Sequence, residues 1–480
     1  MLFNSLHFAI FFPIVVALYF ALAHEKRWML LLAASLYFYM AWNPAYVVLL
    51  LTATAINFWA GARIGASSDP RARKLYLVTG VSTSLAILFF YKYFNLFNET
   101  LRSGFTWAGL PYPVSSLHFL LPVGISFYTF HTLTYTIDVY RGIQKPENRF
   151  GIFALFVSFF PQLVAGPIAR SSMLMPQFDE RHDFDYRLAA SGLKLMAWGF
   201  FKKLVIADHL TAYVDQVYGA PQDFSGPVLV MATVFFAFQI YCDFSGYTDI
   251  AIGSARIMGF RLMLNFNHPY VSKNVREFWR RWHISLSTWF RDYFYVSLGG
   301  NRVPVPRWYL NLFLTFLVSG LWHGASWTFV AWGALHGLYV VVGTATEPLR
   351  RRIAEATGLA RMPRLHHTLQ LLITFSLVTL AWVFFRARSL GEAMTVLARL
   401  PVGMSSFHDL YLDLGAYSFW VSIASIVVLE AVQYWQRNGD VVEWVSERPV
   451  LVRWGLYYAL IVAILVFGEF GGQDFVYFQF

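Results

Sequence analysis

The chain has 480 residues, of which 57% are hydrophobic and only 13% are charged. Soluble domains carry about 25% charged residues, and a soluble globule of this size has too little interior to cover so much apolar surface. Aromatic residues make up 19% of the chain, which suits a lipid-facing surface with aromatic belts at the membrane interfaces. The composition therefore excludes an ordinary soluble domain and indicates a protein that crosses a lipid bilayer several times.

The net charge of +10 comes from 37 Lys and Arg residues against 27 Asp and Glu residues. The basic residues lie in short loops between apolar runs, where they act as topology signals and as anchors to acidic lipid headgroups. This distribution argues against nucleic-acid binding. Cys242 is the one cysteine of the sequence, and its apolar surroundings indicate a small core residue.

Apolar runs of about 20 residues, the length that crosses a bilayer, recur along the chain. They lie at residues 6–22, 28–42, 45–61, 75–94, 117–137, 150–168, 190–206, 228–252, 279–298, 309–343, 368–385, 416–435 and 453–470. Some runs are short or amphipathic, so we expect about ten to twelve true spans in one domain that covers residues 1–480. The first run lacks the basic start and the cleavage site of a signal peptide, so we expect a retained helix.

The run at 309–343 is too long for one crossing and is rich in glycine, at positions Gly320, Gly324, Gly333 and Gly337. We therefore expect a broken or hairpinned element. Membrane proteins tolerate such breaks where they line a cavity buried in protein.

The loop charges predict an orientation in the membrane. Residues 24–27 and 63–74 form basic turns, whereas the loop near 96–113 balances Glu99 against Arg102. Because basic loops stay in the cytoplasm, we expect the N-terminus on the opposite side of the membrane. Three consecutive arginines at 350–352 then mark another cytoplasmic segment.

Ionisable residues enter an apolar region at 239–249, where Asp243 and Asp249 lie. Carboxylates at membrane depth usually face a bundle interior or a wet cavity. The alternative is that both aspartates satisfy broken helix ends or pair with nearby arginines. Asn265 follows in a turn-like segment.

The spacing of residues 275–292 predicts one helix with two distinct faces. The first face is cationic and bears a histidine: Arg276, Arg280, His283 and Ser287. The second is largely aromatic: Phe278, Trp282, Ser285 and Trp289. A cationic face would attract an anionic ligand such as the phosphates of a coenzyme, and the alternative is an interfacial helix that binds lipid headgroups.

His323 is the one ionisable residue between Asn311 and Leu335. A lone histidine on an apolar helix is usually a hydrogen-bonded core residue. A neutral imidazole can, however, take a hydroxyl proton while the hydroxyl oxygen attacks a thioester. His336 lies on another face of a straight helix, so the two histidines approach only if the helix breaks. No short-spaced ligand pair supports a metal site built from His283, His323 and His336.

These segments resemble the membrane-bound O-acyltransferase (MBOAT) family, in the branch that contains the alginate O-acetyltransferase membrane subunit. The resemblance rests on residues 121–130, 137–142, 165–167, 243–249, 265–267, 277–289, 298–302, 320–324 and 475–480. It implies an all-α polytopic fold in which a ring of about ten to twelve tilted or broken helices surrounds a central tunnel. The core of that fold would lie at about residues 118–343.

The resemblance also implies roles for particular residues. Trp322-His323-Gly324 matches the motif of the family's catalytic histidine, which implies that His323 is the general base. His283 matches a second polar position that orients the acceptor or polarises the thioester carbonyl. The further candidates for binding the donor or lining the tunnel are Arg276, Arg280, Trp322, Asp243 and Asn265.

The implied function is membrane O-acetylation of an exported polysaccharide. An acetyl thioester such as acetyl-CoA would donate from the cytoplasm of a bacterial inner membrane, with no bound cofactor or metal. Periplasmic acetyltransferase or polymer-modification proteins would pass the acetyl group to alginate, cellulose or another exopolysaccharide. The alternatives are D-alanyl transfer to a cell-wall polymer, a transporter or channel, and a non-catalytic structural subunit.

Tyr477 lies in the aromatic hexapeptide 475–480, after the last apolar run. A similar motif on a small partner peptide of the related D-alanylation system implies an acyl-carrying role. An O-acetyl tyrosine would be an activated ester suited to onward transfer. Tyr477 is therefore a candidate acyl relay, and the alternative is an interfacial aromatic anchor.

Overall fold

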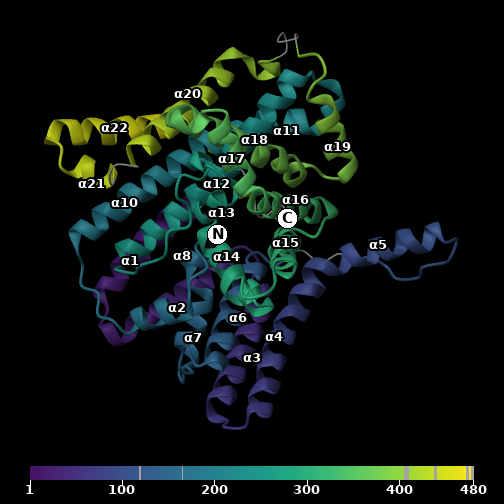
Figure 1. Cartoon of the computed structure of the whole chain (residues 1–480). Helices are drawn as coiled ribbons and strands as arrows, with labels where there is room; N and C mark the ends of the chain where they lie inside the picture. Colours follow the sequence, from purple (N-terminus) through teal and green to yellow (C-terminus); the bar gives the residue numbers. More distant parts are fainter. Residues whose placement is uncertain (118–120, 165, 405–409, 437–440, 472–474, 477–480) are drawn as a thin grey trace. The chain divides into compact units, whose positions relative to one another are not determined.

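The computed structural model describes residues 1–117, 121–164, 166–404, 410–436, 441–471 and 475–476. All regular elements in these residues are helices, which confirms the all-α prediction (Figure 1). The chain forms two compact units. Unit 1 comprises Met1–Met196 and Thr248–Met263, and unit 2 comprises Ala197–Tyr247 and Leu264–Phe480. A single domain over 1–480 stays a prediction.

The helices of unit 1 are α1 (Leu6–Ala21), α2 (His24–Met40), α3 (Tyr46–Ala66), α4 (Pro70–Leu88), η1 (Phe89–Tyr93), α5 (Phe94–Trp107), α6 (Ile125–Arg141), α7 (Phe150–Ser158), α8 (Phe160–Leu163), α9 (Ser171–Leu174) and η2 (Met175–Phe178). Helices α10 (Tyr186–Phe200) and α12 (Gly226–Ile257) contribute residues to both units.

The first helices of unit 2 are η3 (Phe201–Ala207), α11 (Asp208–Gly219), η4 (Pro221–Asp223), η5 (Pro269–Val271), α13 (Val275–Arg281), α14 (Ile284–Trp289), η6 (Phe290–Tyr295), η7 (Val296–Leu298), α15 (Val305–His323) and α16 (Trp327–Ala345). They are followed by α17 (Glu347–Ala356), η8 (Leu359–Arg361), α18 (Pro363–Arg386), α19 (Leu390–Arg399), η9 (Leu412–Leu414), α20 (Gly415–Gln436), α21 (Val441–Ser446) and α22 (Val450–Phe467).

Seven helices of the described chain are long and apolar enough to cross a membrane. They are Tyr46–Ala66, Pro70–Trp107, Gly226–Ile257, Trp327–Ala345, Pro363–Arg386, Gly415–Gln436 and Val450–Phe467. The chain is thus a multi-pass membrane protein, with fewer long spans than the ten to twelve expected. Several expected spans are shorter or broken helices, as at 150–168 and 279–298, because apolar composition alone does not separate a span from helical pieces buried within the protein.

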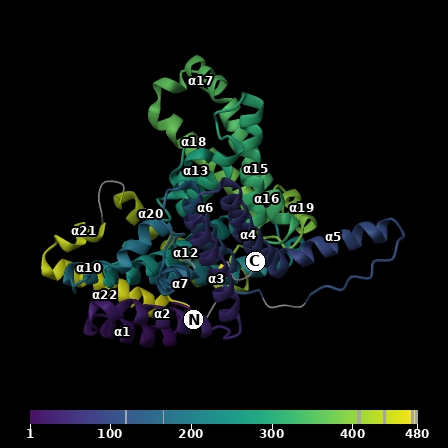
Figure 2. The same cartoon turned by 90° about the horizontal axis from the view of Figure 1, so that it is seen from below.

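The predicted break within 309–343 is confirmed. Helix α15 ends at His323, Gly324 is extended, and the Ser326 hydroxyl caps α16 by accepting a hydrogen bond from Thr328 N at 3.3 Å. Such a cap satisfies one of the first unpaired N–H groups of a helix. A Cβ atom at Gly320 would collide with the backbone oxygen of Phe329, so glycine is what lets α15 and α16 approach closely. Helix α16 also packs against α18 (Figure 1, Figure 2).

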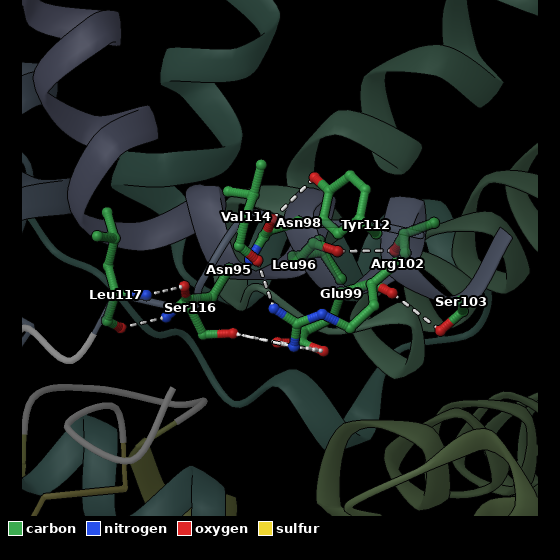
Figure 3. Close-up of polar contacts among 11 residues, drawn as sticks. Asn95, Leu96, Asn98, Glu99, Arg102, Ser103, Tyr112, Val114, Ser116 and Leu117 are labelled. Atoms are coloured by element: carbon green, nitrogen blue, oxygen red, sulfur yellow. Dashed lines mark hydrogen bonds and ion pairs between the residues drawn. The ribbon is translucent and has the colours of Figure 1, made fainter. Parts of the chain in front are cut away.

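The loop that follows α5 returns along that helix and is held by polar contacts (Figure 3). The Asn95 amide donates to Leu117 O at 2.7 Å and accepts from Leu117 N at 2.9 Å. Arg102 donates to Glu99 at 2.9 Å and to Val114 O at 2.6 Å. The apolar face of α5, which contains Phe97, Leu101 and Phe105, is exposed. Helix α5 therefore has one polar face, which binds the returning loop, and one exposed apolar face.

Candidate active site

His323 is buried at the end of α15 and is enclosed by aromatic rings. The centre of its imidazole lies 4.9 Å from that of Trp322, 4.9 Å from that of Trp332 and 5.6 Å from that of Phe385. These rings come from α15, α16 and α18, so the hairpin break places the histidine where three helices meet. His323 is only 3% exposed, so these surroundings shield its imidazole from water.

His283 occupies a strained position between α13 and α14. Its φ is 42° and its ψ is 56°, a left-handed conformation that residues other than glycine rarely adopt. The side chain is fully buried. Backbone strain at a buried polar residue persists only where the surrounding structure enforces it, and such sites are often functional.

The prediction of one continuous helix over 275–292 is therefore wrong. Arg276 and Arg280 are exposed on α13, whereas His283 is buried beyond its end, so they do not share one face. The cause is Asn265, which lies 18 residues earlier in the chain. Its backbone oxygen accepts from Ile284 N at 2.8 Å, and its side chain accepts from Ser285 N at 3.2 Å. These bonds start a new helix. The spacing of residues within 275–292 could not predict them, because Asn265 lies outside that segment.

Asn265 also determines the tautomer of His283. Because the Ser285 backbone N–H can only donate, the Asn265 side-chain atom that faces it is the oxygen, Oδ1. The same oxygen lies 3.1 Å from His283 Nδ1, so Nδ1 carries the proton and Nε2 carries the lone pair. His283 lies outside the seven candidate spans, and burial lowers its pKa to about 3. Its imidazole is therefore neutral at physiological pH.

His336 has a structural partner of its own. The Trp279 indole N–H donates to His336 Nδ1 at 3.2 Å. Because an indole N–H can only donate, His336 Nδ1 is the acceptor. The Trp332 ring contacts both His336, at 4.8 Å between centres, and His323, at 4.9 Å. The helix break thus brings both histidines to one indole ring, with His336 as a hydrogen-bonded core residue.

Trp322 contacts both of the predicted catalytic histidines. Its ring centre lies 4.9 Å from His323 and 6.3 Å from His283. Four of the predicted site residues therefore come together in unit 2: His283, His323, Trp322 and Asn265. Arg276 remains at the surface, where it donates to Thr344 Oγ1 at 2.5 Å and lies 4.0 Å from Glu347.

Asp243 takes part in a buried ion cluster. Lys203 Nζ lies 2.6 Å from Asp243 Oδ1 and 2.7 Å from Asp208 Oδ1, and the three side chains are only 1–2% exposed. The aspartate thus pairs with a lysine, not with an arginine. Sequence reasoning missed Lys203 and Asp208, although charged residues within the apolar run 190–206 and directly after it were a usable signal.

The C-terminal segment reaches this cluster through its described residues. Val476 N donates to Asp243 Oδ2 at 2.8 Å. The Phe475 ring is fully buried, 4.6 Å from the Tyr247 ring and 5.6 Å from the Phe244 ring. The candidate relay Tyr477 lies outside the described residues.

Comparison with known proteins connects this site to one family. Residues 150–385 match the membrane-bound O-acyltransferase family, MBOAT. The chain is 44% identical over 386 residues to a probable alginate O-acetylase of Pseudomonas aeruginosa, covering 80% of this chain and 71% of that protein. It is 36% identical over 439 residues to a peptidoglycan O-acetyltransferase of Helicobacter pylori, covering 85% and 80%.

A more distant relative is a teichoic acid D-alanyltransferase of Streptococcus thermophilus. It is 29% identical over 293 residues, which cover 56% of this chain and 69% of that protein. The identity to the first two relatives extends over most of both chains and includes the segment that contains the histidine centre. The chain therefore belongs to the membrane-bound O-acyltransferase family and is a multi-pass membrane enzyme that transfers an acyl group to oxygen.

Proposed function

We propose that this enzyme transfers acetyl groups for the O-acetylation of an exported polysaccharide, with alginate as the first candidate. The observation that carries the proposal is the pair of buried histidines, His283 and His323, whose rings both contact the Trp322 ring. Two relatives, 44% and 36% identical over the aligned residues, are named for O-acetylation of a polymer, alginate in one case and peptidoglycan in the other.

The proposed chemistry is attack of a hydroxyl group on an acetyl thioester. The His323 imidazole takes the hydroxyl proton while the oxygen bonds to the carbonyl carbon and the carbon–sulfur bond breaks. The proton then passes to the departing thiolate. His283 presents the lone pair of Nε2, because its Nδ1 proton faces Asn265. Of the two roles expected for His283, this tautomer favours orienting the acceptor by accepting a hydrogen bond from its hydroxyl.

The proposed donor is acetyl-CoA or another acetyl thioester that arrives from the cytoplasm. Arg276 contacts Thr344 at the end of α16, directly before α17, and α17 contains the three arginines 350–352. The excess of basic residues supports a cytoplasmic position for this end of unit 2, and we propose that the N-terminus lies in the periplasm of a bacterial inner membrane. Arg276 and Arg280 are exposed there and suited to binding the phosphates of the donor.

The proposed onward route leads to the periplasm by way of Tyr477. An acetyl ester on this phenol would be activated for transfer to periplasmic polymer-modification proteins and then to the polysaccharide. Two residues earlier, Phe475 packs against Phe244, whose ring lies 4.6 Å from His283. If Tyr477→Phe retained full acetylation of the polymer, the acetyl group would have to pass by another route.

The test compares His323→Asn with His336→Asn in proteoliposomes supplied with labelled acetyl thioester. Asparagine at 336 can still accept the Trp279 hydrogen bond, so this matched change spares the core contact. Loss of a general base lowers the rate by about 10²–10⁴-fold, and we expect this loss at His323 only. Equal loss in both variants would contradict a catalytic role for His323. Competition by a D-alanyl thioester would point instead to D-alanyl transfer.

A further inference from the structure

The segment that follows α22 is attached to unit 2 at two described points. Glu469 N donates to Leu204 O at 3.0 Å, and Val476 N donates to Asp243 Oδ2 at 2.8 Å. Leu204 belongs to η3, a seven-residue π-helix that also contains Lys203. π-Helical segments are rare and occur often at functional sites. The same π-helix thus provides one attachment directly and supports the other through the Lys203–Asp243 pair.

Asp243 uses its two carboxylate oxygens for different partners. Oδ1 accepts from Lys203, and Oδ2 accepts from the backbone of Val476. The ammonium group therefore holds the carboxylate in place, and the opposite oxygen is aimed at the chain. A hydrogen bond to a charged acceptor is stronger than one between neutral groups, and burial removes the water that would compete for it.

The side chain next to this bond occupies an aromatic site. Phe475 is fully buried between Tyr247 and Phe244, one turn apart on α12. The Phe244 ring also meets the His283 imidazole edge to face, at 4.6 Å between centres. A polar bond to the backbone and an aromatic contact to the side chain together define the position and the direction of the segment.

We propose that Lys203, Asp243, Phe244 and Tyr247 form a seat for the C-terminal aromatic segment, with Asp243 as a positioning residue that holds the chain one residue before Tyr477. The occupant of the seat is the pair Phe475–Val476 of this same chain, which begins the C-terminal aromatic segment. This assignment rests on the proposed function, because it gives the seat the task of presenting that segment for acyl transfer. Asp208 forms an ion pair with Lys203, whereas Asp243 accepts the hydrogen bond from Val476 N.

The test measures how accessible position 476 is to a thiol reagent. Val476→Cys keeps the backbone N–H that bonds to Asp243, and Cys242→Ala removes the one native thiol. In this background, Asp243→Asn is compared with Asp208→Asn, using alkylation by a small maleimide. Each change leaves one carboxylate paired with Lys203, so the buried charge is equally balanced in both variants.

We expect Asp243→Asn to raise the alkylation rate of the thiol introduced by Val476→Cys by about tenfold, since a charge-assisted bond to the segment is lost. Asp208→Asn leaves the bond between Asp243 and the backbone of residue 476 in place, so it should change that rate by less than about twofold. Acetylation of the exported polysaccharide should fall more in Asp243→Asn than in Asp208→Asn. Equal alkylation rates in the two variants, or no change with Asp243→Asn, would overturn the proposal.

A second pair of variants decides the question if Asp243→Asn does not fold. Phe475→Ala empties the aromatic site without changing the ion cluster, whereas Phe475→Leu keeps most of its volume. Alkylation at 476 should rise in the first and stay near the parent rate in the second, and equal rates would refute the seat. Because alkylation does not depend on acyl transfer, failure of the seat and failure of the proposed acetylation are distinguishable.

Discussion

Two clusters of charged and polar side chains, one in each unit, show how strongly burial changes the contribution of an ion pair to stability. The α5 cluster of unit 1 comprises Asn95, Glu99, Arg102 and Ser116, with Arg102 and Glu99 37% and 52% exposed (Figure 3). The Lys203 cluster of unit 2 comprises Lys203, Asp208 and Asp243, each 1–2% exposed. An exposed ion pair contributes about 0–1 kcal/mol, whereas removing one partner of a buried pair costs about 3–5 kcal/mol.

The clusters also differ in how far along the chain their partners lie. Every contact of the α5 cluster joins residues within 22 positions of each other, so it shapes a local loop. Asp243 instead bonds to Lys203, 40 positions away, and to Val476, 233 positions away. Long-range contacts between buried charges are made where the fold must hold one particular arrangement. This difference is the reason that we propose a functional role for the Lys203 cluster and none for the α5 cluster.

The largest effect on stability should come from Lys203→Met. This change leaves Asp208 and Asp243 buried without their cation, and we expect a loss of about 3–5 kcal/mol. Thermal unfolding in detergent measures the loss. The triple variant Lys203→Met, Asp208→Asn, Asp243→Asn leaves no charge of the cluster unpaired and should recover part of it. If Lys203→Met unfolded like the parent protein, the comparison between buried and exposed clusters would fail.

An intermediate effect is expected for Asn265→Ala. The change removes the acceptor of His283 Nδ1 and of Ser285 N, and leaving buried donors unsatisfied costs about 1–3 kcal/mol. Because His283 also loses its fixed tautomer, acetyl transfer should fall by about tenfold or more. Ser285→Ala is the control, since it removes a hydroxyl but keeps the Asn265–His283 bond. Equal kcat values for Asn265→Ala and Ser285→Ala would show that Asn265 does not position His283.

The smallest effect should follow Arg102→Met in the α5 cluster. The pair with Glu99 is solvent-exposed, so we expect a loss of less than about 1 kcal/mol. High salt should reduce even this difference, because it screens exposed charges. Acetyl transfer in proteoliposomes should equal that of the parent protein. A loss as large as that of Lys203→Met would show that exposure does not govern the strength of these clusters.

Much of the candidate site was predictable from the sequence. The glycine-rich run 309–343 predicted a break, and the structure has it directly after His323. The motif around His323 indicated the family, which the relatives confirm. The break of the segment 275–292 into two helices was not predictable, because hydrogen bonds to Asn265 start a new helix after His283. Periodicity describes only contacts within a helix.

The sequence by itself determined that this chain is a helical, multi-pass membrane protein of one enzyme family, because the length of an apolar run and a local motif depend only on residues that are close together in the sequence. Only the tertiary structure decided which polar groups meet. It brought the Trp322 ring into contact with both His283 and His323, paired Lys203 with two aspartates, and bound Val476 to Asp243. These contacts join distant segments, and their energies depend on burial, which arises only when the helices pack together.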